Sequence, residues 1–183
     1  MSNIWFTSDL HEGHRNIGKF RRLPQWALDE AKGDSTLANT IWIDTHWRRL
    51  VSGKRDIIYC LGDNAFTEWG IDQIAARPGD KRMMGGNHDD LPVESYLRAF
   101  SNVRGCEKRY GLWLSHFPQH PVELRGNMSG HGHVHYATID DWRYINLCCD
   151  NLYEQTGQPM INLDSLRKTM EHRRIHKDTR IIL

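Results

Sequence analysis

Histidine and aspartate side chains recur along this chain at a spacing of two residues. Among its 11 histidines, His131, His133 and His135 alternate with other residues, and Asp9 and His11 are spaced in the same way. In an extended segment, residues two apart project to the same side. A carboxylate and an imidazole, or two imidazoles, can then chelate one metal ion. The clustered histidines predict metal ligands, whereas Asp9 and His11 taken alone are more often a surface Asp and His.

Three further clusters place a polar side chain in a short loop, at 62–64 (GDN), 86–89 (GNHD) and 115–118 (SHFP). Glycine lets the backbone approach a ligand closely, and a carboxylate at the end of a strand can bridge two cations. Taken singly, each cluster has a plainer interpretation. Gly-Asp and Asp-Asn are common in turns, and a single histidine is more often structural or exposed.

Together, these side chains suit phosphoryl chemistry on two metal ions. Two cations about 3.5–4 Å apart can activate a bridging water and neutralise the phosphoryl oxygens during in-line displacement. An imidazole that titrates near pH 7 can protonate the leaving alkoxide. Nitrogen and oxygen ligands without thiolate favour manganese, iron, nickel, cobalt or zinc over magnesium, and we expect manganese.

Apolar runs lead into these clusters, which indicates that strand ends position them. The expected strands are 4–8, 56–61, 81–84, 112–114 and 144–149, and the expected helices are 37–51, 71–76, 93–100 and about 164–172. Ser35 or Thr36 is available to cap the first of these helices, and Gly53 to end it. Strands that alternate with helices predict an α/β fold, in which ligands bind at the carboxyl ends of the strands.

The order D-x-H, GD, GNHD, a single histidine and GHxH resembles the calcineurin-like metallophosphoesterase superfamily, from Asp9 to His135. The runs FTSDLHEGHRNI and HGHVH look like those of the compact phosphoesterases of bacteria and phages. The resemblance implies a single domain over 1–183, built of two mixed β-sheets packed as a sandwich with helices outside.

The resemblance also implies seven metal ligands: Asp9, His11, Asp63, Asn87, His116, His133 and His135. In the family pattern the first two bind one ion, the third bridges both ions, and the next two bind the second ion. The motif GHxH begins at Gly130 or at Gly132. We prefer the second register, which places His133 on the second ion and His135 on the first, with His131 beside them.

Other residues are expected to act on the substrate. By family position and chemistry, His88 is the general acid, and Asp89 either orients its ring or is a solvated loop carboxylate. Asn87 is also expected near the substrate. His14 either touches substrate or supports a ligand, unless it is an exposed loop histidine. Arg125 either meets a phosphate or lies on the surface.

Three functions follow from these residues. The first is hydrolysis of phosphodiesters, such as cyclic nucleotides or nucleic-acid ends, with a nucleotide as one candidate partner. The second is hydrolysis of phosphomonoesters at the same site. The third is a structural metal-binding module, which fits poorly because structural zinc sites are usually cysteine-rich and closed. The oligomeric state does not follow from the sequence.

Composition excludes some other classes. Lys and Arg total 24 against 23 Asp and Glu, so no bulk charge draws the chain to nucleic acid or to a membrane. The basic run 167–180 is expected to be a solvated helix face, the alternative being a patch for polyanions. The four cysteines form no C-x-x-C pair and are expected to be reduced and buried. Without a signal peptide or an apolar run of about 20 residues, a cytoplasmic location is expected.

Overall fold

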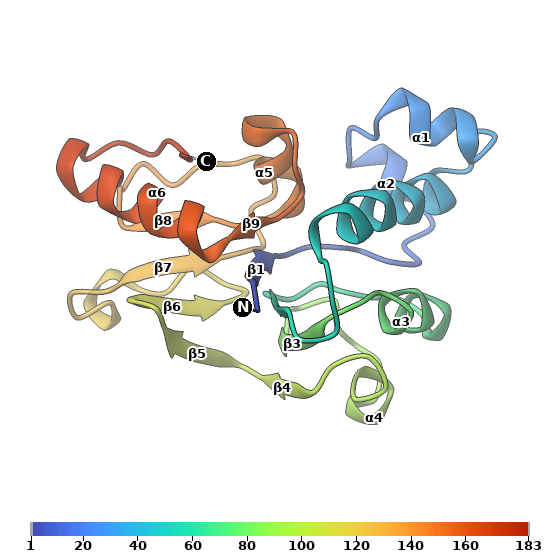
Figure 1. The fold of residues 1–183 in the computed structure, drawn as a ribbon, viewed down its shortest axis with the longest axis horizontal. Coiled ribbons are helices and arrows are strands. Elements are labelled where there is room, and N and C mark those ends of the chain that lie inside the picture. The colour runs from blue at the N-terminus through green and yellow to red at the C-terminus, as the bar shows by residue number, and fades with distance from the viewer. Residues whose placement is uncertain (1, 183) are drawn as a thin grey trace.

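A computed structural model describes residues 2–182, which form two mixed β-sheets with helices around them (Figure 1). The first sheet has the order β4-β3-β2-β1-β9, and only β9 runs antiparallel to its neighbour. In the second sheet, β5-β6-β7-β8, only β5 does so. The strands are β1 (Ile4–Thr7), β2 (Ile57–Cys60), β3 (Asp80–Met84), β4 (Asn102–Arg104), β5 (Cys106–Arg109), β6 (Leu112–Ser115), β7 (Met128–His131), β8 (Tyr144–Asn146) and β9 (Ile161–Asn162). The predicted α/β class is therefore confirmed.

Side chains of the first sheet alternate between two cores, as the two-residue repeat of a strand requires. Trp5 packs with the helices on one side, whereas Phe6 belongs to the other core. That second core contains Leu114 and Ile145 of the second sheet and Leu166 of a C-terminal helix. The two sheets therefore share one apolar core.

Four of the helices, α2, α3, α4 and α6, agree with the predicted positions apart from their ends, whereas α1 and α5 were not predicted. They are α1 (Gln25–Glu30), α2 (Ser35–Leu50), α3 (Glu68–Ala75), α4 (Val93–Tyr96), α5 (Cys149–Thr156) and α6 (Leu163–His176), with short 3-10 turns η1 (Ile17–Lys19) and η2 (Pro121–Glu123). The cap of α2 is Asp34, whose carboxylate accepts from the backbone N–H groups of Thr36 and Leu37, rather than Ser35 or Thr36 itself.

The predicted strand 144–149 was too long. The Asn146 side chain accepts from the backbone N–H of Cys148, and Cys149 begins α5. Cys148, Cys149 and Cys60 are buried as expected, but Cys106 is exposed on the edge strand β5, which corrects the expectation for that cysteine.

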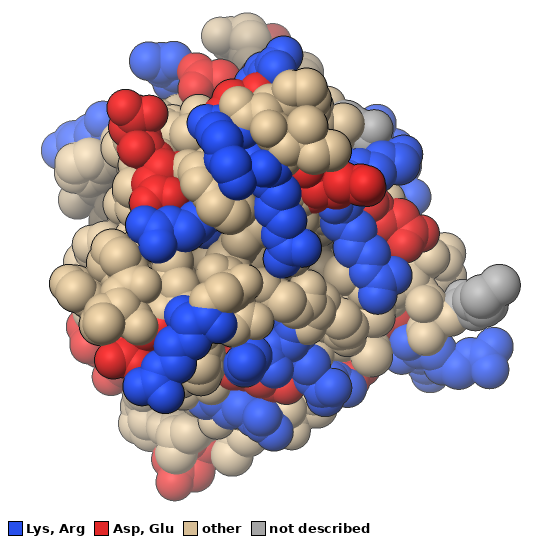
Figure 2. Space-filling view, turned by 90° about the vertical axis from the view of Figure 1, so that its left-hand side faces the viewer, with Lys and Arg blue, Asp and Glu red and all other residues tan. Residues whose placement is uncertain are grey.

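The basic run 167–180 makes up most of α6 and extends past its end, and its charges are mixed in sign. On the face that includes the C-terminal end of this helix, Lys and Arg side chains are interspersed with Asp and Glu (Figure 2). Arg173 points inward and donates to the carbonyl oxygen of Tyr144 at 2.6 Å. The mixed charges on this face and the inward position of Arg173 favour a solvated helix face over a patch for polyanions. Within residues 2–182, no helix is both long and apolar enough to cross a membrane.

Candidate metal centre

The predicted ligands follow strands whose carboxyl ends lie at one edge of the two sheets. Asp9 follows β1, Asp63 follows β2, and His116 follows β6 directly. Two backbone hydrogen bonds of 2.9 Å connect the first two loops, from Asp9 N–H to the Gly62 carbonyl oxygen and from His11 N–H to that of Asp63. Because the strands are parallel neighbours, side chains far apart in the sequence converge here.

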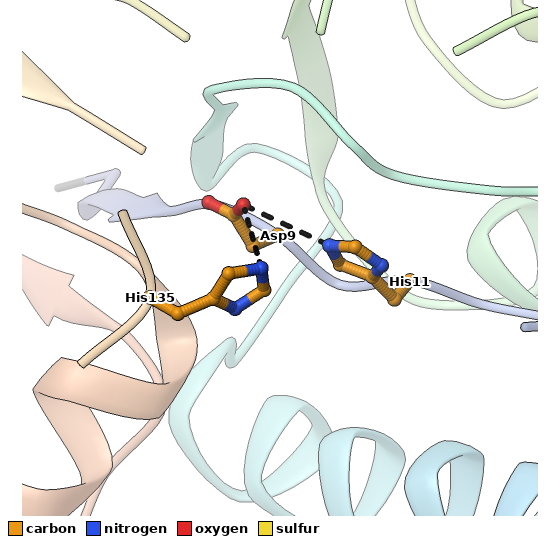
Figure 3. A group of neighbouring side chains, drawn as sticks. All are labelled: Asp9, His11 and His135. Atoms are coloured by element: carbon orange, nitrogen blue, oxygen red, sulfur yellow. Dashed lines mark ion pairs between the residues drawn. The ribbon is translucent and has the colours of Figure 1, made fainter. Parts of the chain in front are cut away.

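A first group of ligands consists of Asp9, His11 and His135, which offer one ligand atom each within 4.8 Å of one another. Both imidazoles point toward the Asp9 carboxylate (Figure 3). The Nε2 atoms of His11 and His135 lie 3.7 and 3.8 Å from Asp9 Oδ1. This geometry favours the GHxH register that begins at Gly132.

A second group consists of Asp9, Asp63 and His116. The Asp63 carboxylate faces both groups, because its Oδ2 lies 3.7 Å from His11 Nε2 and its Oδ1 lies 3.4 Å from His116 Nε2. The Asn87 amide oxygen lies 3.0 Å from His116 Nε2. This is the arrangement expected of a bridging carboxylate with ligands on either side.

The His116 ring is held in an orientation that suits a ligand. Its Nδ1 contacts the Leu61 carbonyl oxygen at 2.9 Å, and since a carbonyl only accepts, Nδ1 carries the hydrogen. Nε2 is then available to a cation.

Burial by itself raises the pKa of Asp9 and Asp63, but the neighbouring imidazoles outweigh it, so both pKa values fall below the ordinary range. Both carboxylates are therefore ionised near pH 7, which is the form that binds cations.

Two observations support a metal ion at this place. Both ring nitrogens of His11 are buried without a hydrogen-bond partner among the described residues, a costly state that an ion would relieve. In addition, nine non-glycine residues within the described range 2–182 have positive φ, and five of them are predicted ligands: Asp9 (59°), His11 (52°), Asp63 (52°), His133 (73°) and His135 (48°). Such backbone strain concentrates at functional sites.

Two glycines let the backbone approach these carboxylates. A Cβ atom on Gly86 would lie 2.2 Å from Asp63 Oδ1, and one on Gly132 would lie 2.5 Å from Asp9 Oδ2. No side chain fits at either position. The lack of room for a Cβ atom therefore explains why glycine precedes Asn87 and His133.

The remaining histidines of the motif occupy different surroundings. His131 is buried at the end of β7, and burial lowers its pKa to about 4. His133 is exposed, with its ring centroid 5.1 Å from that of His116, and its backbone N–H donates to the Asp9 carboxylate at 3.0 Å. His133 thus lies on the side of the second group, next to His116, whereas His131 is buried in β7.

Asp89 differs from the expectation that it orients the His88 ring. Its carboxylate accepts from the backbone N–H groups of Asp63 and Asn64 at 2.8 Å and of Gly86 at 2.9 Å. Burial raises the pKa of Asp89. It is thus neither a solvated carboxylate nor a partner of the His88 ring, and it holds the loop after β2 against the loop after β3.

Three of the residues predicted to act on the substrate, His88, His14 and Arg125, fall in different places. His88 is exposed, with its ring 5.2 Å from that of Phe66, and His14 is half-buried, 4.5 Å from the same ring. Arg125, by contrast, lies three residues before β7, at the strand end opposite to the site, and it pairs with Glu123 at 3.4 Å. The structure therefore does not support a phosphate contact by Arg125.

Asp150 and Arg21, to which the sequence analysis assigned no role, support the first group. The Asp150 carboxylate accepts from Nδ1 of His135 at 2.8 Å, which leaves His135 Nε2 to face Asp9. Arg21 binds the same carboxylate through Nε at 2.6 Å and Nη2 at 3.0 Å. Carboxylates that orient metal-binding histidines in this way raise the basicity of the ligand. Only the position of Asp150, shortly after a predicted strand, offered a signal for it.

Replacing Asp150 with asparagine is expected to weaken binding of one metal ion by about 10–100-fold, because the amide no longer fixes the His135 ring through a charged hydrogen bond. Titration of the metal-free protein with zinc or manganese measures this effect. Asp164→Asn, at a carboxylate 89% exposed, is the matched control and should bind as the wild type does. Unchanged affinity in a folded Asp150→Asn protein would contradict the supporting role.

Comparison with known proteins identifies relatives without a described activity. The chain is 31% identical to the "Gene 66 protein" of Mycobacterium phage L5, over 96% of this chain and 86% of that protein. It is 33% identical to the "Gene 66 protein" of Mycobacterium phage D29, over 92% of this chain and 96% of that one. An uncharacterized protein, MJ1445 of Methanocaldococcus jannaschii, is 27% identical over 80% of this chain and 77% of its own length.

The fold also occurs in a solved structure. A protein of unknown function from Aquifex aeolicus, AQ665, superposes with a TM-score of 0.65 at 22% identity, over 92% of this chain and 99% of that one. The likeness concerns the fold alone. No protein-family model matches the sequence.

Proposed function

The chain belongs to the family of the Gene 66 proteins of mycobacteriophages L5 and D29, and from its site we propose that it is a metal-dependent phosphoesterase that hydrolyses phosphodiesters. The observation that carries this proposal is the pair of ligand groups that share Asp9, with the Asp63 carboxylate facing both. We assign the groups to two divalent ions, with manganese favoured by the nitrogen and oxygen ligands. The core shared by the two sheets supports the metallophosphoesterase sandwich as the fold family.

In the proposed hydrolysis, the metal ions and His88 have different roles. When bound, the two ions would supply the activation of water and the neutralisation of phosphoryl charge. His88 stands at the open side of the centre, where its exposed ring can donate a proton to the departing oxygen. Its backbone N–H donates to Asp63 Oδ1 at 2.9 Å, which fixes its position relative to the ligands.

A specific observation favours diesters over monoesters. The cavity beside the first group is lined by His11, His14, Ile17, Phe20, Phe66, His88 and His135. This lining contains no Lys or Arg, the residues that commonly bind the extra charge of a phosphate dianion. It suits a second ester group, which carries no charge.

The test is an assay of metal-stripped protein with manganese, nickel, zinc or magnesium, on bis-p-nitrophenyl phosphate and on p-nitrophenyl phosphate. We expect diester turnover that returns with manganese. Asp63→Asn should lower it by ~10²-fold or more, since a bridging carboxylate supports charge stabilisation worth several kcal/mol.

Asp72→Asn is the matched control, because this carboxylate is 59% exposed and pairs with Arg98 on the surface. It should leave turnover unchanged. If only the monoester were turned over, the proposed metal centre would still stand, but the preference for diesters would be refuted. Two bound ions with no turnover of either ester would instead support a structural metal-binding module.

A further inference from the structure

The cavity beside the first ligand group is walled by aromatic rings. Its volume is about 380 Å³, which is within the range of small-molecule sites. His11 and His135 line it on the side of the metal centre, so a group bound there would be joined directly to the phosphate. The other walls are formed mainly by His14, Phe20 and Phe66.

Phe66 is the centre of this wall. Its ring centroid lies 4.5 Å from that of His14 and 5.2 Å from that of His88, with interplanar angles of 37° and 26°. The Phe20 ring continues the series at 5.9 Å from His14 and at 30° to it. Each ring of this series is inclined by less than 40° to the next, and all four line the cavity.

The cavity combines histidine rings with apolar side chains, and Ile17, Phe20 and Phe66 are its apolar members. Of the lining residues, Phe20 is 66% exposed and Ile17 is buried, so the Phe20 ring is accessible to a bound group. An uncharged planar group meets matching surfaces here, because aromatic rings prefer offset-stacked or edge-to-face contacts.

We propose that this cavity is a subsite for a planar aromatic group of the ester, such as a phenyl ring or a nucleobase, held against Phe66 and Phe20. The inference rests on the proposed function, because the phosphate must be held by the adjacent metal centre. Stacking on an aromatic side chain tolerates many planar rings but discriminates against a saturated ring of the same size. Phe66 and Phe20 are therefore the residues that determine specificity for the ester group.

The experiment measures binding of three phosphonates to the metal-loaded protein by calorimetry. Benzylphosphonate presents a planar ring one atom from phosphorus, cyclohexylmethylphosphonate presents a saturated ring, and methylphosphonate presents none. None of them is an ester, so binding is measured without turnover. The wild type is expected to bind benzylphosphonate about tenfold more tightly than the cyclohexyl compound.

Phe66→Leu and Phe20→Leu should each reduce this preference toward unity and leave the affinity for methylphosphonate unchanged. Phe20 is exposed, so its variant tests the proposal even if Phe66→Leu fails to fold. Phe117→Leu is the matched control, since this 48% exposed ring lies 5.0 Å from His116 on the side of the second group, outside the cavity.

The outcomes separate the two proposals. If all three phosphonates bind equally well to the loaded wild type, the aromatic subsite is refuted and the metal centre stands. If none binds, including methylphosphonate, the proposed phosphoesterase centre itself fails. If both phenylalanine variants still preferred benzylphosphonate, its ring would have to bind outside the proposed cavity, and the proposal would be overturned.

Discussion

His88→Ala should lower turnover of a dinucleoside monophosphate by ~10²–10⁴-fold, the usual contribution of a general acid. An alkoxide is a strong base and leaves slowly unless it is protonated as the bond breaks. The p-nitrophenolate ion is stable without a proton, so bis-p-nitrophenyl phosphate should lose far less. The ratio of the two losses, measured from kcat on both substrates, identifies the acid.

The structure explains why this variant should keep its metal ions. The His88 side chain is exposed, and its link to the ligands is the backbone N–H that donates to Asp63, which alanine retains. His176 is also exposed but lies on α6, away from the site loops. His176→Ala is therefore the matched control and should leave both rates unchanged. Equal losses on both substrates would show that His88 supports the site by some means other than proton donation.

Arg21→Met is expected to destabilise the protein by about 3–5 kcal/mol, because it leaves a buried carboxylate without its partner. The side chains of Arg21 and Asp150 are each 1% exposed. The guanidinium uses all five of its N–H groups, two on Asp150, one on the Asn39 side chain, and one each on the carbonyl oxygens of Asp9 and Leu10. Denaturant unfolding of the metal-free protein measures the change in the free energy of unfolding.

The neighbouring residue provides the control for this prediction. Arg22 pairs with Glu154 at 2.6 Å, the same distance, but its side chain is 79% exposed. Arg22→Met should therefore cost less than about 1 kcal/mol. The double variant Arg21→Met with Asp150→Leu should recover part of the loss, since no buried charge is then left unpaired. Equal effects of Arg21→Met and Arg22→Met would mean that burial does not set the strength of the pair.

Local sequence determined the strands that lead into the ligand loops. Short apolar runs such as those before Asp9 and Asp63 can be recognised because all residues after the first are buried, and the polar residue that follows marks the strand end. The spacing of Asp9 and His11 likewise predicted two members of the first group. Helix α2 was found from its apolar positions, although its cap was predicted one or two residues late, at Ser35 or Thr36 instead of Asp34.

Other elements carried no such signal. Strand β7 reads Met-Ser-Gly-His, which is neither apolar nor alternating, yet all four residues are buried. Gly130 fits there because a Cβ atom would lie 3.0 Å from Leu147 and 3.2 Å from Leu114, so its neighbours rather than its own side chain fill the core. The strand exists because β6 and β8 flank it.

The roles of the charged residues were decided by tertiary contacts. Asp89 follows His88 in the sequence, but the backbone N–H groups of the loop after β2 lie closer to its carboxylate and bind it. Arg21 and Asp150 are 129 residues apart and meet only because the chain folds back on itself. Local sequence thus determined which side chains could bind a metal ion, since strand ends and residue spacing are local properties. Only the tertiary structure decided which groups orient them, because a hydrogen bond depends on distance in space and not on position along the chain.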